Sequence, residues 1–248
     1  MPDFVQIDCG PMQPRGLRIH AGTFVTLFRR DQGWVMIDSG YGVTDVRNPS
    51  LITRIFCAFV RTPLKEENCA IQQMPRFSIN PKYVNDIILT HLHLDHAGGI
   101  SDFPWARVHV LRKELQAARS HRGRQGIGYL SRHWKHGPDW KLYDHIDSDW
   151  FGFPAMRVAD MQPEVYLIPT PGHTRGHAMI AFQVSKGWVL QTGSAGYPSY
   201  GHDEDQARAP GWFKHWLMGD YTARLQTLWQ EHRDEITFLS SHEFRNSR

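Results

Sequence analysis

Residues 90–99 read Thr-His-Leu-His-Leu-Asp-His-Ala-Gly-Gly, a stretch with four side chains of metal-ligand type: His91, His93, Asp95 and His96. Residues 85–90 before it read Asn-Asp-Ile-Ile-Leu-Thr, and this apolar run predicts a strand buried on both faces. The histidines would therefore lie in the turn at the carboxyl end of that strand. Side chains at positions i and i+2 of an extended chain point the same way, so His91 and His93 would converge on one ion. Asp95 and His96 would project from the next turn toward a second ion.

A third histidine follows another predicted strand. Residues 169–177 read Pro-Thr-Pro-Gly-His-Thr-Arg-Gly-His and come directly after the apolar run 165–168. His173 in this turn would complete a three-histidine set with His91 and His93. Three neutral ligands and a water molecule form a catalytic arrangement with an open position. His177 is also of ligand type, and we favour a supporting or structural role for it.

The segment 237–242, Thr-Phe-Leu-Ser-Ser-His, is again a short apolar strand that ends in a histidine. His242 would join Asp95 and His96 at the second ion. Imidazole suits zinc, iron, copper and nickel, and the added carboxylate favours zinc, manganese or iron over copper.

The order of these segments, with Val-Met-Ile-Asp-Ser-Gly at 35–40 upstream, resembles the metallo-β-lactamase-fold hydrolases. Within them it is similar to the branch of acyl-homoserine-lactone lactonases and glyoxalase II-like enzymes. The resemblance covers about residues 20–244 and implies an α/β fold, a four-layer αββα sandwich with the metal site at one edge of its two sheets. It also implies a hydrolase of a lactone, ester or thioester that uses a metal-bound hydroxide, with one or two Zn²⁺ ions and with Mn²⁺ or Fe²⁺ as alternatives.

Residue 194 departs from the family pattern. The family places a metal-bridging aspartate in a Gly-Asp-Ala turn after a strand, whereas residues 193–195 here read Gly-Ser-Ala. Ser194 is a neutral and weak ligand, so two divalent ions would be opposed by one protein carboxylate, Asp95. The chain is then a one-metal enzyme, an impaired two-metal enzyme, or a ligand-binding descendant without catalysis, and the sequence leaves these alternatives open.

The resemblance also implies two catalytic side chains. Asp95 would take a proton from the attacking water and return it, as its counterpart does in the family. Tyr197 lies where related lactonases place a tyrosine that hydrogen-bonds the substrate carbonyl or leaving oxygen, with simple packing as the alternative role. Persulfide dioxygenase chemistry on the same fold requires the aspartate that Ser194 replaces, which argues against that activity.

Hydrophobic spacing predicts the rest of the fold. Two strand pairs separated by short polar turns are expected at 23–30 with 34–38 and at 179–184 with 188–191. Helical stripes are expected to cover the sheets at Leu51, Ile52, Ile55, Phe56 and Phe59 and at Tyr221, Leu225, Leu228 and Trp229. We expect one domain over residues 1–248 with a lid or pocket insertion around 119–155, where glycines precede several aromatic residues.

Composition bounds the partners and the compartment. The 248 residues carry a net charge of only +3, and one compact domain with scattered charge predicts no nucleic-acid partner. No stretch approaches about 18 apolar residues and the first twenty residues lack an apolar run, so we expect neither a membrane span nor a signal peptide. Three cysteines without a CxxC motif favour free thiols in the cytoplasm. The basic segment 112–136, with Glu114 as its only acid, is either a rim for an anionic small-molecule substrate or a solvated surface. A homodimer is a further expectation from the lactonase resemblance.

Overall fold

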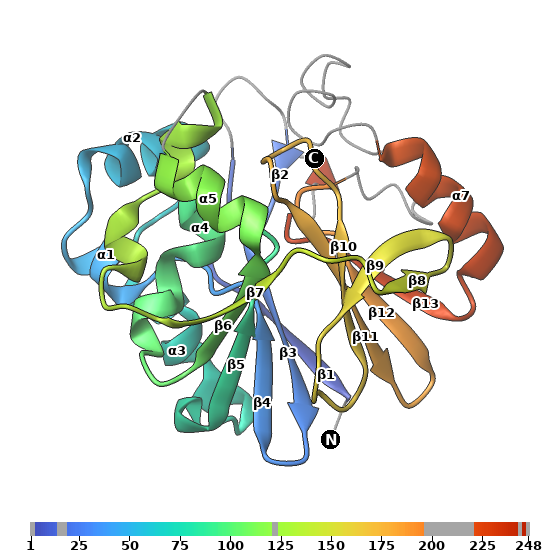
Figure 1. Cartoon of the computed structure of the whole chain (residues 1–248). Helices are drawn as coiled ribbons and strands as arrows, with labels where there is room; N and C mark the ends of the chain where they lie inside the picture. The colour runs from blue at the N-terminus through green and yellow to red at the C-terminus, as the bar shows by residue number, and fades with distance from the viewer. Residues whose placement is uncertain (1–2, 14–18, 121–123, 196–220, 243–244, 247–248) are drawn as a thin grey trace.

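Two six-stranded sheets lie face to face in the computed structural model, which describes residues 3–13, 19–120, 124–195, 221–242 and 245–246 (Figure 1). The first sheet has the strand order β1-β3-β4-β5-β6-β7. Its strands are β1 Phe4–Asp8, β3 Phe24–Arg30, β4 Gly33–Ile37, β5 Val84–Ile88, β6 Arg107–Leu111 and β7 Asp139–Tyr143. The first three form antiparallel neighbours, and β4 to β7 run parallel.

The second sheet has the order β13-β12-β11-β10-β9-β8. Its strands are β8 Ser148–Trp150, β9 Phe153–Arg157, β10 Val165–Pro169, β11 Ala178–Val184, β12 Gly187–Gln191 and β13 Ile236–Leu239. Only β12 and β13 are parallel. A short antiparallel pair, β2 Ile19–His20 with β14 Arg245–Asn246, brings residues near the two ends of the chain together. The two predicted strand pairs are thus confirmed as β3 with β4 and β11 with β12.

Alternation along the strands divides the core into layers. On β4, Ile37 packs toward the second sheet, whereas its neighbour Met36 packs toward the helices. On β11, Phe182 faces the first sheet and stacks on Phe28 at 4.3 Å between ring centroids, whereas Met179 faces the opposite side. Each such fully buried side chain contributes about 1.5–3 kcal/mol. Both faces of each sheet are therefore covered, which is the predicted αββα sandwich.

Helices cover the outer faces of the two sheets (Figure 1). The helices beside the first sheet are α1 Val43–Arg47, α2 Leu51–Val60, α3 Ala70–Gln73, α4 Leu94–Ala97 and α5 Arg112–Ser120, and α7 Thr222–His232 lies on the second sheet. Short 3-10 turns connect them at η1 Glu66–Asn68, η2 Met74–Phe77, η3 Pro81–Tyr83, η4 Gly98–Asp102, η5 Arg124–Gly128 and η6 Ser131–Trp134. None of the helices in the described ranges combines the length and the apolar character needed to cross a membrane.

The two predicted helical stripes have different outcomes. On α7, Leu225 and Leu228 are buried against the second sheet, as expected. On α2 the prediction is wrong for Leu51, Ile55 and Phe59, which are exposed by 73%, 61% and 53%, whereas Phe56 is partly buried against neighbouring hydrophobic residues. The helix instead buries its other face, through Thr53, Cys57 and Val60. Most of its apolar stripe therefore faces outward.

The aromatic residues predicted near a lid are largely part of the core. Trp134 packs into the cluster on the outer face of the first sheet, and Trp150 into the cluster under α7. The predicted insertion, 119–155, includes the edge strands β7 and β8 and the start of β9. The role of the remaining segment as a lid stays a prediction. All three cysteines are buried and free.

Candidate metal centre

The candidate ligands lie in turns at the carboxyl ends of strands from both sheets. His91 follows β5, and His93 is the N-cap residue directly before α4. Asp95 and His96 lie within α4. From the second sheet, the turn between β10 and β11 carries His173, and the segment after β13 carries His242. The strands thus deliver side chains that are far apart in sequence to one place.

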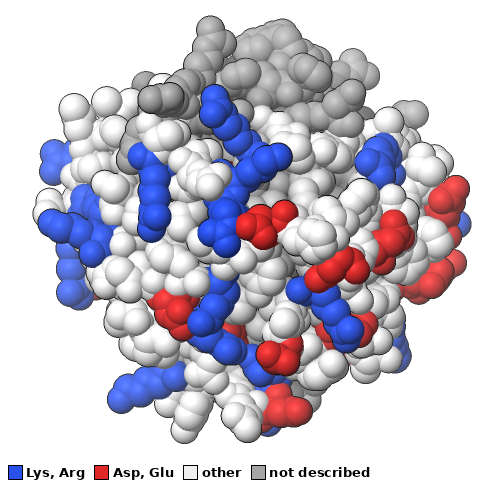
Figure 2. All heavy atoms as spheres, in the orientation of Figure 1, with Lys and Arg blue, Asp and Glu red and all other residues white. Residues whose placement is uncertain are grey.

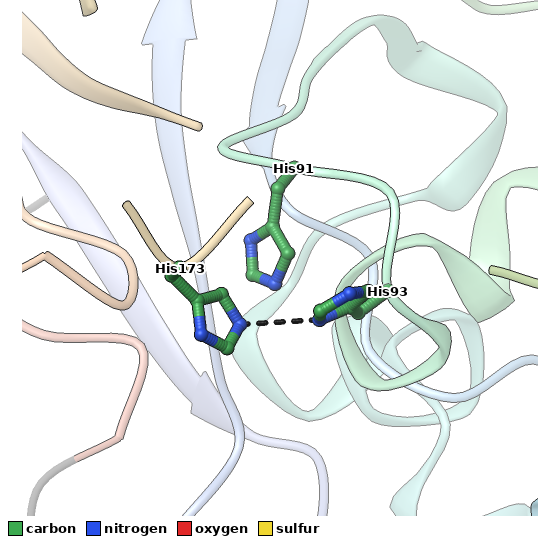
Figure 3. A group of neighbouring side chains, drawn as sticks. All are labelled: His91, His93 and His173. Carbon is green, nitrogen blue, oxygen red and sulfur yellow. Dashed lines mark hydrogen bonds between the residues drawn. The ribbon is translucent and has the colours of Figure 1, made fainter. Parts of the chain in front are cut away.

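His91, His93 and His173 form the first group (Figure 3). Their nitrogen atoms lie within 4.8 Å of one another, and Nδ1 of His93 is 3.1 Å from Nε2 of His173. His91 is fully buried, and its Nε2 has no hydrogen-bond partner in the described part of the chain. The ring of His93 lies against the backbone of Gly128, where a Cβ atom would come within 2.5 Å of the imidazole. A buried ring nitrogen without a partner is costly unless an ion binds it, so this group fits a metal.

Asp95, His96 and His242 form the second group. Nε2 of His96 and Nε2 of His242 are 3.1 Å apart, and Oδ2 of Asp95 lies 3.6 Å and 3.4 Å from them. Ligand atoms at tetrahedral positions 2.0–2.1 Å from zinc would be about 3.3 Å apart. The three atoms therefore already have the spacing that one ion requires. The rings of His91 and His96 are 4.0 Å apart between centroids, so the two groups are adjacent.

Hydrogen bonds behind the rings determine which nitrogen faces the centre. Nδ1 of His96 is 2.8 Å from the buried carboxylate of Asp38, which can only accept, so His96 carries its proton on Nδ1. The hydroxyl of Thr90 donates to Asp38 at 2.9 Å and lies 3.0 Å from Nδ1 of His91. Because the Thr90 proton is directed to Asp38, His91 also donates from Nδ1. Both rings thus present an Nε2 lone pair toward the centre, as metal-binding histidines do.

The same logic holds on the side of the second sheet. Nδ1 of His242 lies 2.9 Å from the carbonyl oxygen of Gly22, an acceptor, so Nε2 again presents its lone pair toward His96. The neighbouring Ser241 donates its hydroxyl to Asp38 at 3.0 Å. Asp38 therefore joins the turns of both candidate groups.

Burial and neighbouring charges shift the pKa values of the candidate ligands in different directions. Burial, followed by the surrounding imidazoles, lowers the pKa of His91 well below its ordinary value. Burial raises the pKa of Asp95, but His96 and His242 outweigh this effect and leave that pKa below the usual range. Burial lowers the pKa of His96, but the carboxylates of Asp95 and Asp38 outweigh burial. The pKa of His96 therefore lies above its ordinary value. A neutral His91 and an ionised Asp95 are the forms that bind metal.

Ser194 lies in the turn after β12, next to His177. Its backbone N–H donates to Nε2 of His177 at 3.0 Å, and Nδ1 of His177 is 2.8 Å from the hydroxyl of Thr170. Both ring nitrogens of His177 are thus engaged, which agrees with a structural role. The hydroxyl of Ser194 is buried and lacks a hydrogen-bond partner among the described residues. Tyr197 lies outside the described residues.

Sequence reasoning gave no role to two buried acids that support the centre. Asp38 ends the strand β4 in the quoted Asp-Ser-Gly segment, a position that resembles the other ligand-bearing turns and could have indicated it. Glu114, at the start of α5, is fully buried and accepts hydrogen bonds from both histidine-bearing turns. Its only signal is that it is the single acid in a basic segment.

The basic segment is in part a paired surface. Arg112 is paired with Asp144, and Arg132 donates to the carbonyl oxygen of Asn48. Figure 2 shows Lys and Arg side chains over the surface around α5, with acidic side chains beside them. An open depression of about 710 Å³ lies between α5 and the turn that carries His173, and Lys113 and Arg175 are among its lining residues.

Family comparison agrees with this geometry. The model of the metallo-beta-lactamase superfamily matches residues 20–238. The chain belongs to this superfamily. The family assignment and the αββα sandwich that the sequence predicted are thereby confirmed.

Relatives within the superfamily include hydrolases and lactonases. A probable metallo-hydrolase of Mycobacterium tuberculosis is 34% identical over 195 residues, which are 77% of this chain and 61% of the relative. An N-acyl homoserine lactonase of a Bacillus species is 30% identical over 173 residues, 69% of this chain and 62% of that protein. The chain thus spans less than two thirds of the length of these relatives.

Solved structures show the same fold. An N-acyl homoserine lactone hydrolase, solved with N-hexanoyl-L-homoserine bound at its catalytic metal centre, has a TM-score of 0.67 and 22% identity. The match covers 97% of this chain and 92% of that one. The two chains therefore share a fold over nearly their whole lengths.

Proposed function

We propose that the protein hydrolyses a lactone, ester or thioester of a small molecule, with divalent metal ions held by two adjacent groups of side chains. The observation that carries this proposal is the convergence of His91, His93 and His173 beside Asp95, His96 and His242. We further propose zinc, because imidazole and carboxylate ligands at tetrahedral spacing suit it, with manganese or iron as alternatives. Two ions are proposed since each group offers three ligand atoms.

A divalent ion at this centre would polarise a carbonyl oxygen and make a water molecule acidic near neutral pH. The protein supplies the orientation and the proton transfer. Asp95 is ionised at neutral pH, since its pKa lies below the usual range, and its carboxylate can accept the proton of the attacking water. It can then return that proton to the leaving oxygen. Tyr197 is proposed to hydrogen-bond the reacting oxygen.

Support for ester-type chemistry comes from the relatives named N-acyl homoserine lactonase. Lys113 and Arg175, which line the open depression beside the His173 turn, favour an anionic group on the substrate. Because Ser194 stands where the family has an aspartate, the number of metal ions bound per chain should be measured together with turnover.

The test uses chelator-washed protein reloaded separately with zinc, manganese or iron, and assayed on panels of lactones, esters and thioesters. Metal-dependent turnover of one class is expected, and His91→Ala should abolish it. Protein that binds metal but hydrolyses no member of the panels would contradict the proposal and favour a ligand-binding descendant. Protein that binds no metal would contradict both the proposed hydrolysis and the proposed metal centre.

A further inference from the structure

Glu114 connects the two turns that carry the first candidate group. The residue lies in the first turn of α5 and is fully buried. Its Oε1 accepts hydrogen bonds from the backbone N–H of Leu92 at 2.9 Å and from the hydroxyl of Tyr129 at 3.0 Å. Its Oε2 accepts from the hydroxyl of Thr174 at 2.8 Å and from the backbone N–H of Gly176 at 3.0 Å. All four partners donate.

The four donors show that the side chain at position 114 must offer two acceptor oxygens. Leu92 lies between His91 and His93, and its backbone N–H meets one carboxylate oxygen, while Gly176 in the other turn meets the second oxygen. A backbone N–H cannot accept a hydrogen bond. A glutamine in place of Glu114 would therefore satisfy one turn and direct its amide N–H₂ at the N–H of the other. Only a carboxylate can accept from the backbone N–H groups of both turns at once.

Packing of the second turn against α5 is as close as the backbone allows. A Cβ atom on Gly176 would lie 2.2 Å from the backbone nitrogen of Glu114. Tyr129, which donates to Glu114, also pairs with His93 in an isolated bridge, and the two rings are 5.0 Å apart between centroids. The carboxylate thus contacts neighbours of His93 on one side and of His173 on the other.

We propose that Glu114 is a positioning residue that sets the distance between His173 and the pair His91 and His93, and thereby the metal affinity of this group. The carboxylate touches neither the ion site nor a reacting atom, and acts through the backbone of the two turns. The inference rests on the metal-binding part of the proposed function and is independent of the substrate.

The test measures metal affinity in Glu114→Gln, with Asp86→Asn as the matched control. Asp86 is another fully buried carboxylate with several donors, Arg30, Arg107 and His109. It lies in β5 five residues before His91, about 16 Å along an extended chain. Both variants should lower the melting temperature. The dissociation constant for Co²⁺ or Zn²⁺, measured by competition with a chromophoric chelator, should rise about tenfold to hundredfold in Glu114→Gln and stay within about threefold in Asp86→Asn.

A milder pair of variants covers the case in which Glu114→Gln fails to fold. Thr174→Val removes one donor to the carboxylate at nearly constant volume, and Thr174→Ser keeps it. The first should raise the dissociation constant about threefold to tenfold and alter the visible absorption of bound Co²⁺. The second should restore both properties to near the wild-type values.

The outcomes separate this inference from the proposed function. Metal binding by the wild-type protein tests the centre itself, and its absence would overturn both. With the wild-type centre intact, unchanged affinity in Glu114→Gln, or an equal loss in Asp86→Asn, would overturn the positioning role. Equal behaviour of Thr174→Val and Thr174→Ser would overturn it as well.

Discussion

Replacement of Asp38 by asparagine should impair the second candidate group by reversing the tautomer of His96. The carboxylate of Asp38 accepts from the backbone N–H of Thr90 at 2.8 Å through Oδ1 and from Nδ1 of His96 at 2.8 Å through Oδ2. The backbone donor holds the amide oxygen of an asparagine at the first position. The amide N–H₂ would then face His96 and donate to Nδ1, so the ring proton would move to Nε2. That nitrogen is the one that lies 3.1 Å from Nε2 of His242.

The magnitude follows from the bonds that must be rearranged. To bind an ion through Nε2, the variant must rotate the amide against the N–H of Thr90 or lose the hydrogen bond to His96. Loss of such an orienting partner typically costs tenfold to hundredfold in metal affinity, about 1.4–2.8 kcal/mol. The hydroxyl of Ser241, which donates to the same oxygen at 3.0 Å, would also face the amide, so stability should fall by roughly 1–3 kcal/mol.

The assay combines calorimetric zinc titration with ¹H–¹⁵N spectra of the histidine rings in the metal-free protein. Ser241→Ala is the control, since it removes one donor to Asp38 without reversing the tautomer. Asp38→Asn should weaken the second ion selectively and place a proton on Nε2 of His96. If the spectra show Nδ1–H in this variant, or if Ser241→Ala weakens the second ion equally, the reasoning is refuted.

Loss of a candidate ligand should distinguish His93 from His177: His93→Ala should lower bound metal and activity together by a large factor, whereas elemental analysis of reloaded His177→Ala should give nearly unchanged metal. Equal effects would contradict the assignment. Ser194→Asp should bring calorimetric stoichiometry toward two ions per chain and raise hydrolysis, since a carboxylate between two cations offsets their repulsion; unchanged stoichiometry and rates would place residue 194 away from the ions. Tyr197→Phe should lower kcat about tenfold or more with little change in stability, and wild-type kinetics would assign the residue to packing. In the metal-free protein, burial lowers the pKa of His177 from 6.5 to about 3. The unfolded chain therefore binds more protons between these pH values, so stability should be complete above about pH 6.5 and fall as the pH drops toward 3. His177→Ala should flatten this part of the denaturation profile, and an unaltered slope would refute the cause.

The strands of this fold could be predicted because their signals are local. The apolar run at 165–168 became β10, Val165–Pro169, and the turn signals at 31–33 and 185–187 correctly separated two antiparallel pairs. The outward face of α2 could not be predicted. Apolar spacing indicates that a helix is amphipathic, but it does not identify the side that meets the sheet, and here the buried side includes Thr53.

In the candidate site, too, the local features could be predicted from the sequence and the long-range contacts could not. Spacing within 91–96 is sufficient to bring ligand atoms together, because a short turn fixes where they point. The supporting carboxylates depend on contacts across the fold: Asp38 lies 52 positions from Thr90, and Glu114 lies 62 positions from Gly176. A local pattern can mark Asp38 as the end of a strand, but it does not contain such distances, so these contacts emerge only when the strands and helices are assembled.

The origin of the candidate ligands in both sheets has a consequence for how the protein comes apart. His93 and His173 are 80 positions apart in the chain, and His96 and His242 are 146 positions apart. An ion held by either group therefore closes a long loop and acts as a removable cross-link between the sheets. With an ion bound, the sheets can separate only after a ligand side chain dissociates from that ion. A chelator should therefore accelerate unfolding and cleavage by proteases at a temperature where the metal-bound protein stays folded. The lifetime of the folded chain then depends on the supply of metal as well as on its core.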